Sequence, residues 1–271
     1  DLVRSRGLGD VYKRQGSGSP GSTDGTGTNA SFNNPFAVAV DSAGNVYVSD
    51  RTNNRIRKIT PLGVVTTLAG SGTAGTTDAT GTNATLTSPN AIAVDLSGNV
   101  YVTDTVNYRI RKISSAGVVT TFAGNSQGYV DGTGTNASFG LPQGLAVDSS
   151  GNVYVGDAHT NRRIRKITSA GVVTTLAGSG SSGNTNGTGT NASFVYPTGV
   201  AVDSAGNVYV MDTGDYRVRK ITPLGVVTYV AGGSPGSTDG VGSNASFNLY
   251  ATGICASSDG LLYVSDVINY R

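Results

Sequence analysis

The stretch Ala39-Val40-Asp41-Ser42-Ala43-Gly44-Asn45-Val46-Tyr47-Val48-Ser49-Asp50 recurs along this chain with few changes. Close copies occupy residues 93–104, 146–157 and 201–212, and a degraded copy occupies residues 255–266. The aspartates that close the five copies are 54, 53, 55 and 54 residues apart. A fixed step of this length indicates one supersecondary unit that is repeated, so the repeat decides the fold.

The composition bounds the class of protein. The 271 residues include 40 Gly, 8 Pro and no Trp, and all 17 acidic residues are Asp. Abundant Gly, Ser, Thr and Asn favour a β fold with many turns. No apolar run reaches the roughly 18 residues of a membrane-spanning helix. The single cysteine, Cys255, excludes an internal disulfide and a cysteine metal cluster.

The first 15 residues do not belong to the repeat, because the similarity between units begins at Gly16. Residues 5–15 resemble the translation of a transposon adapter used in sequencing libraries. We interpret residues 1–15 as a non-native leader, with a real basic tail as the alternative. They carry four basic and two acidic residues, which accounts for the net charge of +2. The neutral remainder gives no electrostatic footprint of a nucleic-acid-binding protein.

From Gly16 onward, each unit contains four short runs with strand composition. In the first unit these are residues 38–40, 46–49, 55–59 and 64–68, rich in Val, Ile, Thr and Tyr and separated by Gly, Pro, Asn or Asp. Such runs predict antiparallel strands joined by hairpins. The Arg and Lys of the third run place it nearer to solvent. Four short strands per repeated unit predict an all-β propeller with four complete blades and a partial fifth.

The recurring pattern Gly-x-Ala-Val-Asp, Gly-Asn-Val-Tyr-Val-x-Asp and Asn-x-Arg-Ile-Arg-Lys-Ile resembles the NHL repeat, over residues 16–271. The resemblance implies a propeller, most often of six blades, so we expect this chain to be an incomplete piece of a larger one. Some NHL propellers are amidating lyases that hold zinc through several histidines. With His159 as its only histidine, this chain cannot assemble such a site.

The loops between the second and third strands vary among the units, whereas the first-to-second turns repeat. A site for an asymmetric ligand must break the repeat, so the varied loops mark the candidate binding face, with unconstrained drift as the alternative. The candidate ligand-binding residues are Arg51, Asn54, Tyr108, His159, Arg162, Asp215, Tyr216 and Tyr270.

A repeated aspartate is followed by an arginine five or six residues later. Their spacing across one connection predicts a structural ion pair that caps the loop, since a catalytic pair would not recur five times. The predicted pairs are Asp50–Arg55, Asp104–Arg109, Asp157–Arg163, Asp212–Arg217 and Asp266–Arg271.

The Gly-rich segments that open the units offer a second, weaker site. Oxygens of Asp24, Asn29, Asp131 and Asn136 could hold calcium, whereas the alternative is a set of Asx-turns that shape a surface loop. Each segment contains one carboxylate, so we predict no catalytic residue and no firm metal or cofactor site. The same segments contain Asn-Ala-Ser/Thr triplets, which match the glycosylation pattern and count as one repeated observation.

The favoured interpretation is a non-enzymatic binding or scaffold propeller that presents its variable loops to a protein, peptide or glycan. Low Lys, absent Glu and high Thr, Gly and Asn resemble extracellular or cell-surface repeat proteins. The alternatives are a lyase or lactonase-like propeller with its site in the channel mouth or in missing blades, and an RNA-binding NHL domain. Open blade edges also predict self-association.

Overall fold

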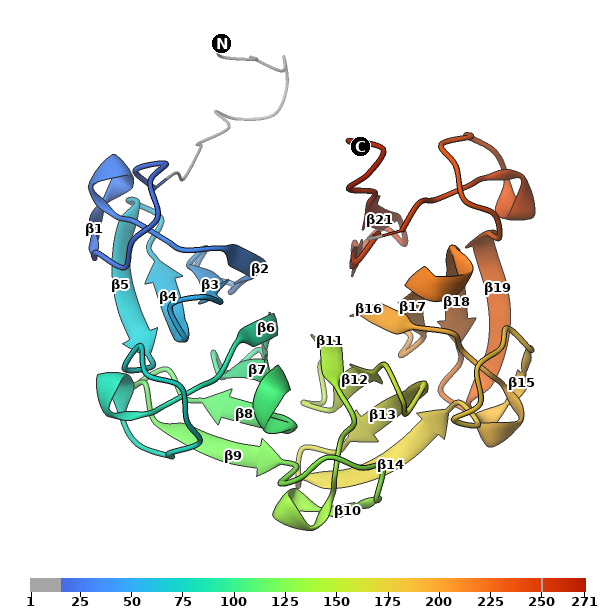
Figure 1. Ribbon diagram of the computed structural model, residues 1–271, viewed down its shortest axis with the longest axis horizontal. Helices are drawn as coiled ribbons and strands as arrows, with labels where there is room; N and C mark the ends of the chain where they lie inside the picture. The colour runs from blue at the N-terminus through green and yellow to red at the C-terminus, as the bar shows by residue number, and fades with distance from the viewer. Residues whose placement is uncertain (1–15, 250) are drawn as a thin grey trace.

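The computed structural model describes residues 16–249 and 251–271, so the leader interpreted as non-native lies outside the described residues. Five antiparallel sheets surround one axis as the blades of a propeller, which confirms the predicted fold. Figure 1 shows an open ring, with the opening between the first blade and the two strands of the fifth. Within the described residues, no helix is long and apolar enough to cross a membrane.

The first blade contains the four predicted strands and one more. From the axis outward they are β2 (Pro35–Val40), β3 (Val46–Asp50), β4 (Arg55–Ile59) and β5 (Val64–Ala69). The additional strand, β1 (Gly25–Thr26), comes from the Gly-rich segment and pairs with the outer edge of β5. Part of the segment that we read as a loop therefore extends the sheet.

The other blades repeat this arrangement with small changes. The second contains β6 (Pro89–Val94), β7 (Val100–Asp104), β8 (Arg109–Ile113) and β9 (Val119–Ala123). The third contains β10 (Gly132–Thr133), β11 (Pro142–Val147), β12 (Val153–Asp157), β13 (Arg163–Ile167) and β14 (Val172–Ala177). The fourth contains β15 (Gly187–Thr188), β16 (Pro197–Val202), β17 (Val208–Asp212), β18 (Arg217–Ile221) and β19 (Val226–Gly232). The fifth contains β20 (Gly253–Ala256) and β21 (Leu262–Ser265).

Seven 3₁₀ helices are the helical elements of the described residues. Five lie in the Gly-rich segments: η1 (Gly27–Asn29), η2 (Gly81–Asn83), η4 (Gly134–Asn136), η5 (Gly189–Asn191) and η7 (Gly242–Asn244). The other two, η3 (Thr105–Asn107) and η6 (Thr213–Asp215), lie between the second and third strands of their blades.

The turn between the first two strands of each blade is held by its aspartate. In the first blade, Asp41 accepts hydrogen bonds from the backbone N–H of Asn45 at 2.8 Å and from the hydroxyl of Tyr47 at 3.0 Å. Gly44 adopts a φ of 77°, which glycine tolerates without strain. The Asp-x-x-Gly-Asn-x-Tyr pattern of the opening stretch is therefore explained by one turn.

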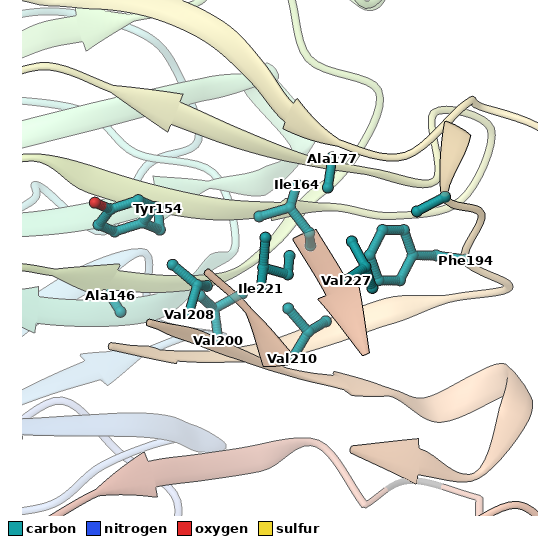
Figure 2. Close-up of a cluster of buried hydrophobic side chains, with 11 residues drawn as sticks. Ala146, Tyr154, Ile164, Ala177, Phe194, Val200, Val208, Val210, Ile221 and Val227 are labelled. Atoms are coloured by element: carbon teal, nitrogen blue, oxygen red, sulfur yellow. The ribbon is translucent and has the colours of Figure 1, made fainter. Parts of the chain in front are cut away.

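Hydrophobic clusters fill the space between neighbouring blades. Figure 2 shows one of them, in which Ile164 and Ala177 of the third blade pack against Val208, Val210 and other side chains of the fourth. Phe194, from the segment that precedes β16, is fully buried in this cluster. Leu86 and Phe139, the equivalents of Phe194 in the preceding units, are also fully buried in clusters between two blades.

The predicted aspartate–arginine pairing is wrong in register. Asp50 pairs with Arg57, at 2.9 Å between Oδ2 and Nη1, instead of with Arg55. The same shift gives Asp104–Arg111 at 2.8 Å, Asp157–Arg165 at 3.3 Å and Asp212–Arg219 at 3.7 Å.

Strand geometry explains the shift. Arg55 and Arg57 lie two residues apart on one face of β4, and the guanidinium of Arg55 donates to the carbonyls of Ser22 and Ser71 at the outer end. Arg109 and Arg163 likewise bind backbone carbonyls, and Arg217 binds Asp215. Only Asp266 and Arg271 meet as predicted, at 3.7 Å.

The charges of the third strand suggested that it lies nearer to solvent, but at this position the strand is buried. The side chains of Arg57 and Asp50 are both fully buried. Arg57 additionally donates to the carboxylate of Asp24 at 2.6 Å and to the carbonyl of Ser31 at 2.9 Å. One buried guanidinium therefore links the second strand, the third strand and the Gly-rich segment of its blade.

We expect that breaking the buried Asp104–Arg111 pair lowers the free energy of unfolding far more than removing Arg109, the predicted partner. Asp104→Ala and Arg111→Ala should each lower the free energy of unfolding by about 3–5 kcal/mol, because each leaves a buried charge without its partner. The double variant should cost clearly less than the sum, measured by urea unfolding. Arg109→Ala, the matched control, should cost about 1 kcal/mol or less. Additive costs, or equal effects of the two arginines, would contradict this assignment.

Candidate binding site at the propeller axis

The variable loops and the innermost strands begin at the same end of the axis. In the first blade, Pro35 at the start of β2 lies opposite Asp50 at the end of β3, directly before the variable loop. Contacts join this loop to its surroundings: Asn54 Oδ1 accepts from the backbone N–H of Ser88, which leads into the next blade. The face chosen from sequence variation is therefore also the mouth of the axis.

Most of the predicted ligand-binding residues occupy a special backbone conformation. Asn54, Tyr108, His159, Arg162, Tyr216 and Tyr270 have φ between 46° and 58°. Asn adopts this left-handed region readily, whereas it is unusual for a bulky residue such as Tyr. In the four complete blades, Asn54, Tyr108, Arg162 and Tyr216 end the loop directly before the third strand, which is a structural role.

The remaining predicted residues have partners inside the protein. The guanidinium of Arg51 lies 5.1 Å from the ring centroid of Phe36, and Asp215 forms an ion pair with Arg217. Tyr270, one of the six predicted residues with positive φ, is almost fully exposed. None of the eight predicted residues lines the axial cavity of the described chain, although Phe36 does.

This axial cavity has a volume of about 720 Å³ and is lined by the first strands of all five blades. Its walls are mainly Ala, Gly, Val, Ile and Leu. The uncharged polar groups in the lining belong to Gln143, Thr198, Thr252, Ser265, Tyr263 and Cys255, and Arg271 contributes the one charge. An apolar cavity with a few placed polar groups is the usual form of a ligand site.

One position of the innermost strand breaks the repeat at the axis. The residue after the strand's opening Pro is Phe36, Asn90, Gln143 or Thr198, and Thr252 stands there in the fifth blade, while the following residues remain small or apolar. Variation in the loops did not point to this position, because it lies inside a strand. The available signal was a single variable residue inside an otherwise repeated strand.

Hydrogen bonds between blades hold these side chains in place. Asn90 is 2% exposed and donates through Nδ2 to Oε1 of Gln143 at 2.5 Å. The bond occupies the carbonyl of Gln143 and leaves its NH₂ group as a donor at the cavity wall. The backbone carbonyl of Asn90 accepts from Ser49 Oγ at 2.6 Å, so the preceding blade supports this strand.

The axial cavity is poorly equipped for acid–base catalysis or metal binding. Every aspartate of the described residues has a hydrogen-bond or ion-pair partner, and none lines the cavity. No group of three His, Cys or Asp side chains that could hold a metal ion occurs in residues 16–249 and 251–271. What the cavity offers is hydrogen bonding by neutral groups.

The segments proposed for calcium have another use for their carboxylates. Asp24 accepts from Arg57 and from Thr67, and Asp131 accepts from Arg165 and Thr175. Asn29 and Asn136 end the 3₁₀ helices η1 and η4. A guanidinium thus supplies the positive charge that calcium would have supplied, so these residues do not fit a calcium site.

The fourth blade departs from this pattern by moving a carboxylate. Asn186 replaces the aspartate of the Gly-rich segment and accepts from Arg219 at 2.9 Å. Asp215 stands where the other blades have an asparagine such as Asn53, which donates to Asp50 at 2.8 Å. Tyr229 stands at the position of Thr67, and its ring centroid lies 4.7 Å from the guanidinium carbon of Arg219. Arg219 therefore has one ion-pair partner, Asp212, whereas Arg57 has two.

This exchange affects the buried Asp212. Burial raises the pKa of Asp212 to about 6, and the like charge of Asp215 adds to the rise. The backbone N–H groups of Tyr196 and Val195 and the guanidinium of Arg219 act in the opposite direction. Asp212 also lacks the amide donor that an asparagine at position 215 would provide.

We therefore expect Asp212 to make stability depend on pH. Its pKa is higher in the folded state than the ordinary 3.8, so ionising Asp212 costs more free energy in the folded protein than in the unfolded chain. Its contribution to the free energy of unfolding is therefore fully present below pH 4 and is lost as pH rises through about 6. The whole shift corresponds to a loss of about 3 kcal/mol between pH 4 and 7, and Asp215→Asn should lower this pKa and remove part of that loss in urea unfolding at several pH values, while the part due to burial remains. Asp239→Asn removes the same charge elsewhere and serves as control. An unchanged pH profile in Asp215→Asn would refute this.

Residues 22–186 match the family described as the SMP-30/Gluconolactonase/LRE-like region, and residues 194–221 match the NHL repeat. Similar proteins include SUPPRESSOR OF QUENCHING 1, chloroplastic, of Arabidopsis thaliana, 28% identical over 93% of this chain and 26% of that protein. NHL repeat-containing protein 2 of Bos taurus is 26% identical over 97% of this chain and 42% of that protein. The chain thus spans less than half the length of these relatives.

Solved structures share the fold at low sequence identity. An auxiliary nutrient binding protein from Bacteroides ovatus has a TM-score of 0.67 and 21% identity, over 91% of this chain and 59% of that chain. A gluconolactonase from Xanthomonas campestris has a TM-score of 0.59 and 16% identity, over 85% of this chain and 69% of that chain. A streptogramin B lyase has a TM-score of 0.58 and 15% identity, over 86% of this chain and 62% of that chain. With the family match over most of its length, the chain belongs to the SMP-30/gluconolactonase/LRE-like propellers and carries NHL repeats.

Proposed function

We propose that this protein is a non-enzymatic binding propeller that takes a neutral, hydroxyl-rich group of a glycan at the axial cavity, outside the cell or at its surface. The observation that carries this is the repeat-breaking position of the innermost strands, which brings Phe36, Gln143, Thr198 and Thr252 to the lining of an otherwise mainly apolar cavity. Blades with the same packing problem have no structural need for such differences.

The chemistry of the cavity favours a neutral ligand. The NH₂ group of Gln143 can donate to a hydroxyl or carbonyl oxygen, and the hydroxyl of Thr252 can donate or accept. The rings of Phe36 and Tyr263 offer apolar faces at the edge of the same cavity. The guanidinium of Arg271 is already bound to Asp239, so it does not favour an anion. The solved propeller described as a nutrient binding protein is consistent with a binding role on this fold.

A lactonase-like enzyme is the second candidate, and family membership favours it. Hydrolysis needs a general base or a metal to activate water, and a divalent cation needs carboxylate or imidazole ligands at the axis. The cavity lining contains no Asp, Glu or His. The residues present therefore do not fit a catalytic metal, and we derive no hydrolytic step from them.

The proposal is tested by a glycan array, followed by calorimetry with the best neutral oligosaccharide. Gln143→Leu should weaken binding about tenfold, because a buried hydrogen bond contributes roughly 1.5 kcal/mol. Gln127→Leu is the matched control, since Gln127 is exposed in the Gly-rich segment of the same blade. Equal effects of the two variants would place the site elsewhere, and preferential capture of peptides on a parallel array would identify a peptide-binding propeller instead.

The enzyme alternative is tested on the same preparation. Sugar lactones should not be hydrolysed above the spontaneous rate, with or without added Ca²⁺, Mn²⁺ or Zn²⁺, because the cavity holds neither a base nor charged metal ligands. Metal-dependent turnover that Gln143→Leu abolishes would overturn the binding proposal in favour of the lactonase.

A further inference from the structure

A pair of side-chain amides joins the second and third blades at the axial cavity. Asn90 follows Pro89 in β6, and Gln143 follows Pro142 in β11. Both strands belong to complete blades that are neighbours in the ring (Figure 1). Nδ2 of Asn90 donates to Oε1 of Gln143 at 2.5 Å. Asn90 is almost fully buried, whereas Gln143 lines the cavity, so Gln143 is the one of the two that a ligand can touch.

An unpaired oxygen explains why the two amides face each other in this way. Among the described residues, Oδ1 of Asn90 is buried and has no hydrogen-bond partner. In the opposite orientation Gln143 would donate to this oxygen, and the NH₂ group of Asn90 would be left buried without a partner. Proteins leave buried carbonyl oxygens unpaired more readily than buried N–H groups. The observed orientation is therefore the less costly one.

This orientation decides which edge of the Gln143 amide meets a ligand. Its carbonyl oxygen accepts from Asn90, which leaves the N–H donors of Nε2 for the cavity. If Asn90 accepted instead of donating, the same side chain would offer an acceptor to the cavity. A buried residue that lies outside the cavity lining thus sets the polarity of this point of the wall.

The wall on both sides of this donor is apolar. The residues that follow the two amides in their strands also line the cavity: Ala91, Ile92, Gly144 and Leu145. A carbonyl oxygen joined to a methyl group suits a fixed donor beside an apolar surface. A hydroxyl group at the same point would bring a donor of its own that needs an acceptor. The acetamido group of an N-acetylated sugar is neutral and combines the required oxygen and methyl group.

We propose that Asn90 is a positioning residue that makes the axial cavity selective for the acetamido group of an N-acetylated glycan. It holds Gln143 with the NH₂ group toward the ligand, where Nε2 donates to the acetamido oxygen while the methyl group contacts the apolar wall. This inference rests on the proposed glycan-binding function and names the sugar substituent that the cavity selects.

Two disaccharides that differ in one kind of substituent test the selectivity. Diacetylchitobiose and cellobiose are both neutral and have the same linkage, but the first has acetamido groups where the second has hydroxyl groups. In calorimetry the wild-type protein should bind diacetylchitobiose about tenfold more tightly or better, the value of one hydrogen bond. Asn90→Leu frees the Gln143 amide to turn, so it should remove most of this preference and leave the affinity for cellobiose nearly unchanged. A purely structural role of Asn90 would weaken both sugars alike.

Gln143→Glu inverts the polarity of the edge without removing its bond to Asn90. The carboxylate can still accept from Nδ2 of Asn90, but its other oxygen is an acceptor where the wild type has a donor. This variant should therefore bind cellobiose more tightly than diacetylchitobiose. Gln127→Glu adds the same charge on an exposed side chain of the same unit, and it should keep the wild-type preference. Circular dichroism checks that each variant retains its sheets.

The orientation of the two amides can be measured in the wild-type protein without a ligand. In NMR spectra, the side-chain NH₂ group of Asn90 should exchange slowly with water, because it is buried and hydrogen-bonded, whereas that of Gln143 should exchange fast. The signals are assigned by their loss in Asn90→Leu and in Gln143→Leu. Slow exchange of the Gln143 NH₂ group, with fast exchange at Asn90, would show the opposite orientation and overturn the proposal.

The outcomes separate this inference from the function on which it rests. Equal affinity of the wild-type protein for the two disaccharides, or an equal loss of both in Asn90→Leu, would overturn the role of Asn90 and leave glycan binding intact. Failure to bind either disaccharide or any glycan of the array would overturn the proposed function and the selectivity with it, and the exchange rates would then still decide the orientation of the amides.

Discussion

The fold depends on a buried guanidinium that is repeated once per complete blade. Arg57 and its equivalents Arg111, Arg165 and Arg219 are fully buried in a protein whose strands are otherwise short and whose surface is rich in Gly, Ser and Thr. Each binds the aspartate that ends the second strand and the backbone of the Gly-rich segment. A long segment with little apolar content is thereby attached to the sheet.

Burial of this pair has an energetic cost. Burial raises the pKa of Asp104 and of Asp157, although each has an arginine and hydrogen-bond donors beside it. The pairing therefore does not recover all of the free energy lost on removing the carboxylate from water. The benefit is specificity, because one arrangement of strand and segment brings partners to both terminal nitrogens of the guanidinium, although its Nε is left without one. The fourth blade keeps the acceptor but not its charge, since the neutral Asn186 accepts from Arg219 while Asp215 pairs with the neighbouring Arg217.

Repetition also separates structural from functional positions. Residues that recur in each unit solve the packing between blades, whereas the residue after the opening Pro of each innermost strand has no such constraint. Asn90 and Gln143 occupy this position in adjacent blades and bind each other. The loops chosen for their variability have largely structural contacts, so variation at the axis is the stronger indication of a ligand. The opening of the ring lies beside the same cavity, through Tyr263 and Arg271 of the fifth blade.

The sequence by itself determined the strands, the turns, the blade unit and the family, because these follow from local patterns. Alternation of Val, Ile and Tyr, and turns held by Asp, Gly and Asn, act over a few residues. The tertiary structure alone decided which arginine meets Asp50, since Arg55 and Arg57 share one strand face and spacing cannot distinguish them. It also decided that Phe36, Gln143 and Thr198 meet at one axis, because residues more than fifty apart become neighbours only when the blades assemble around it.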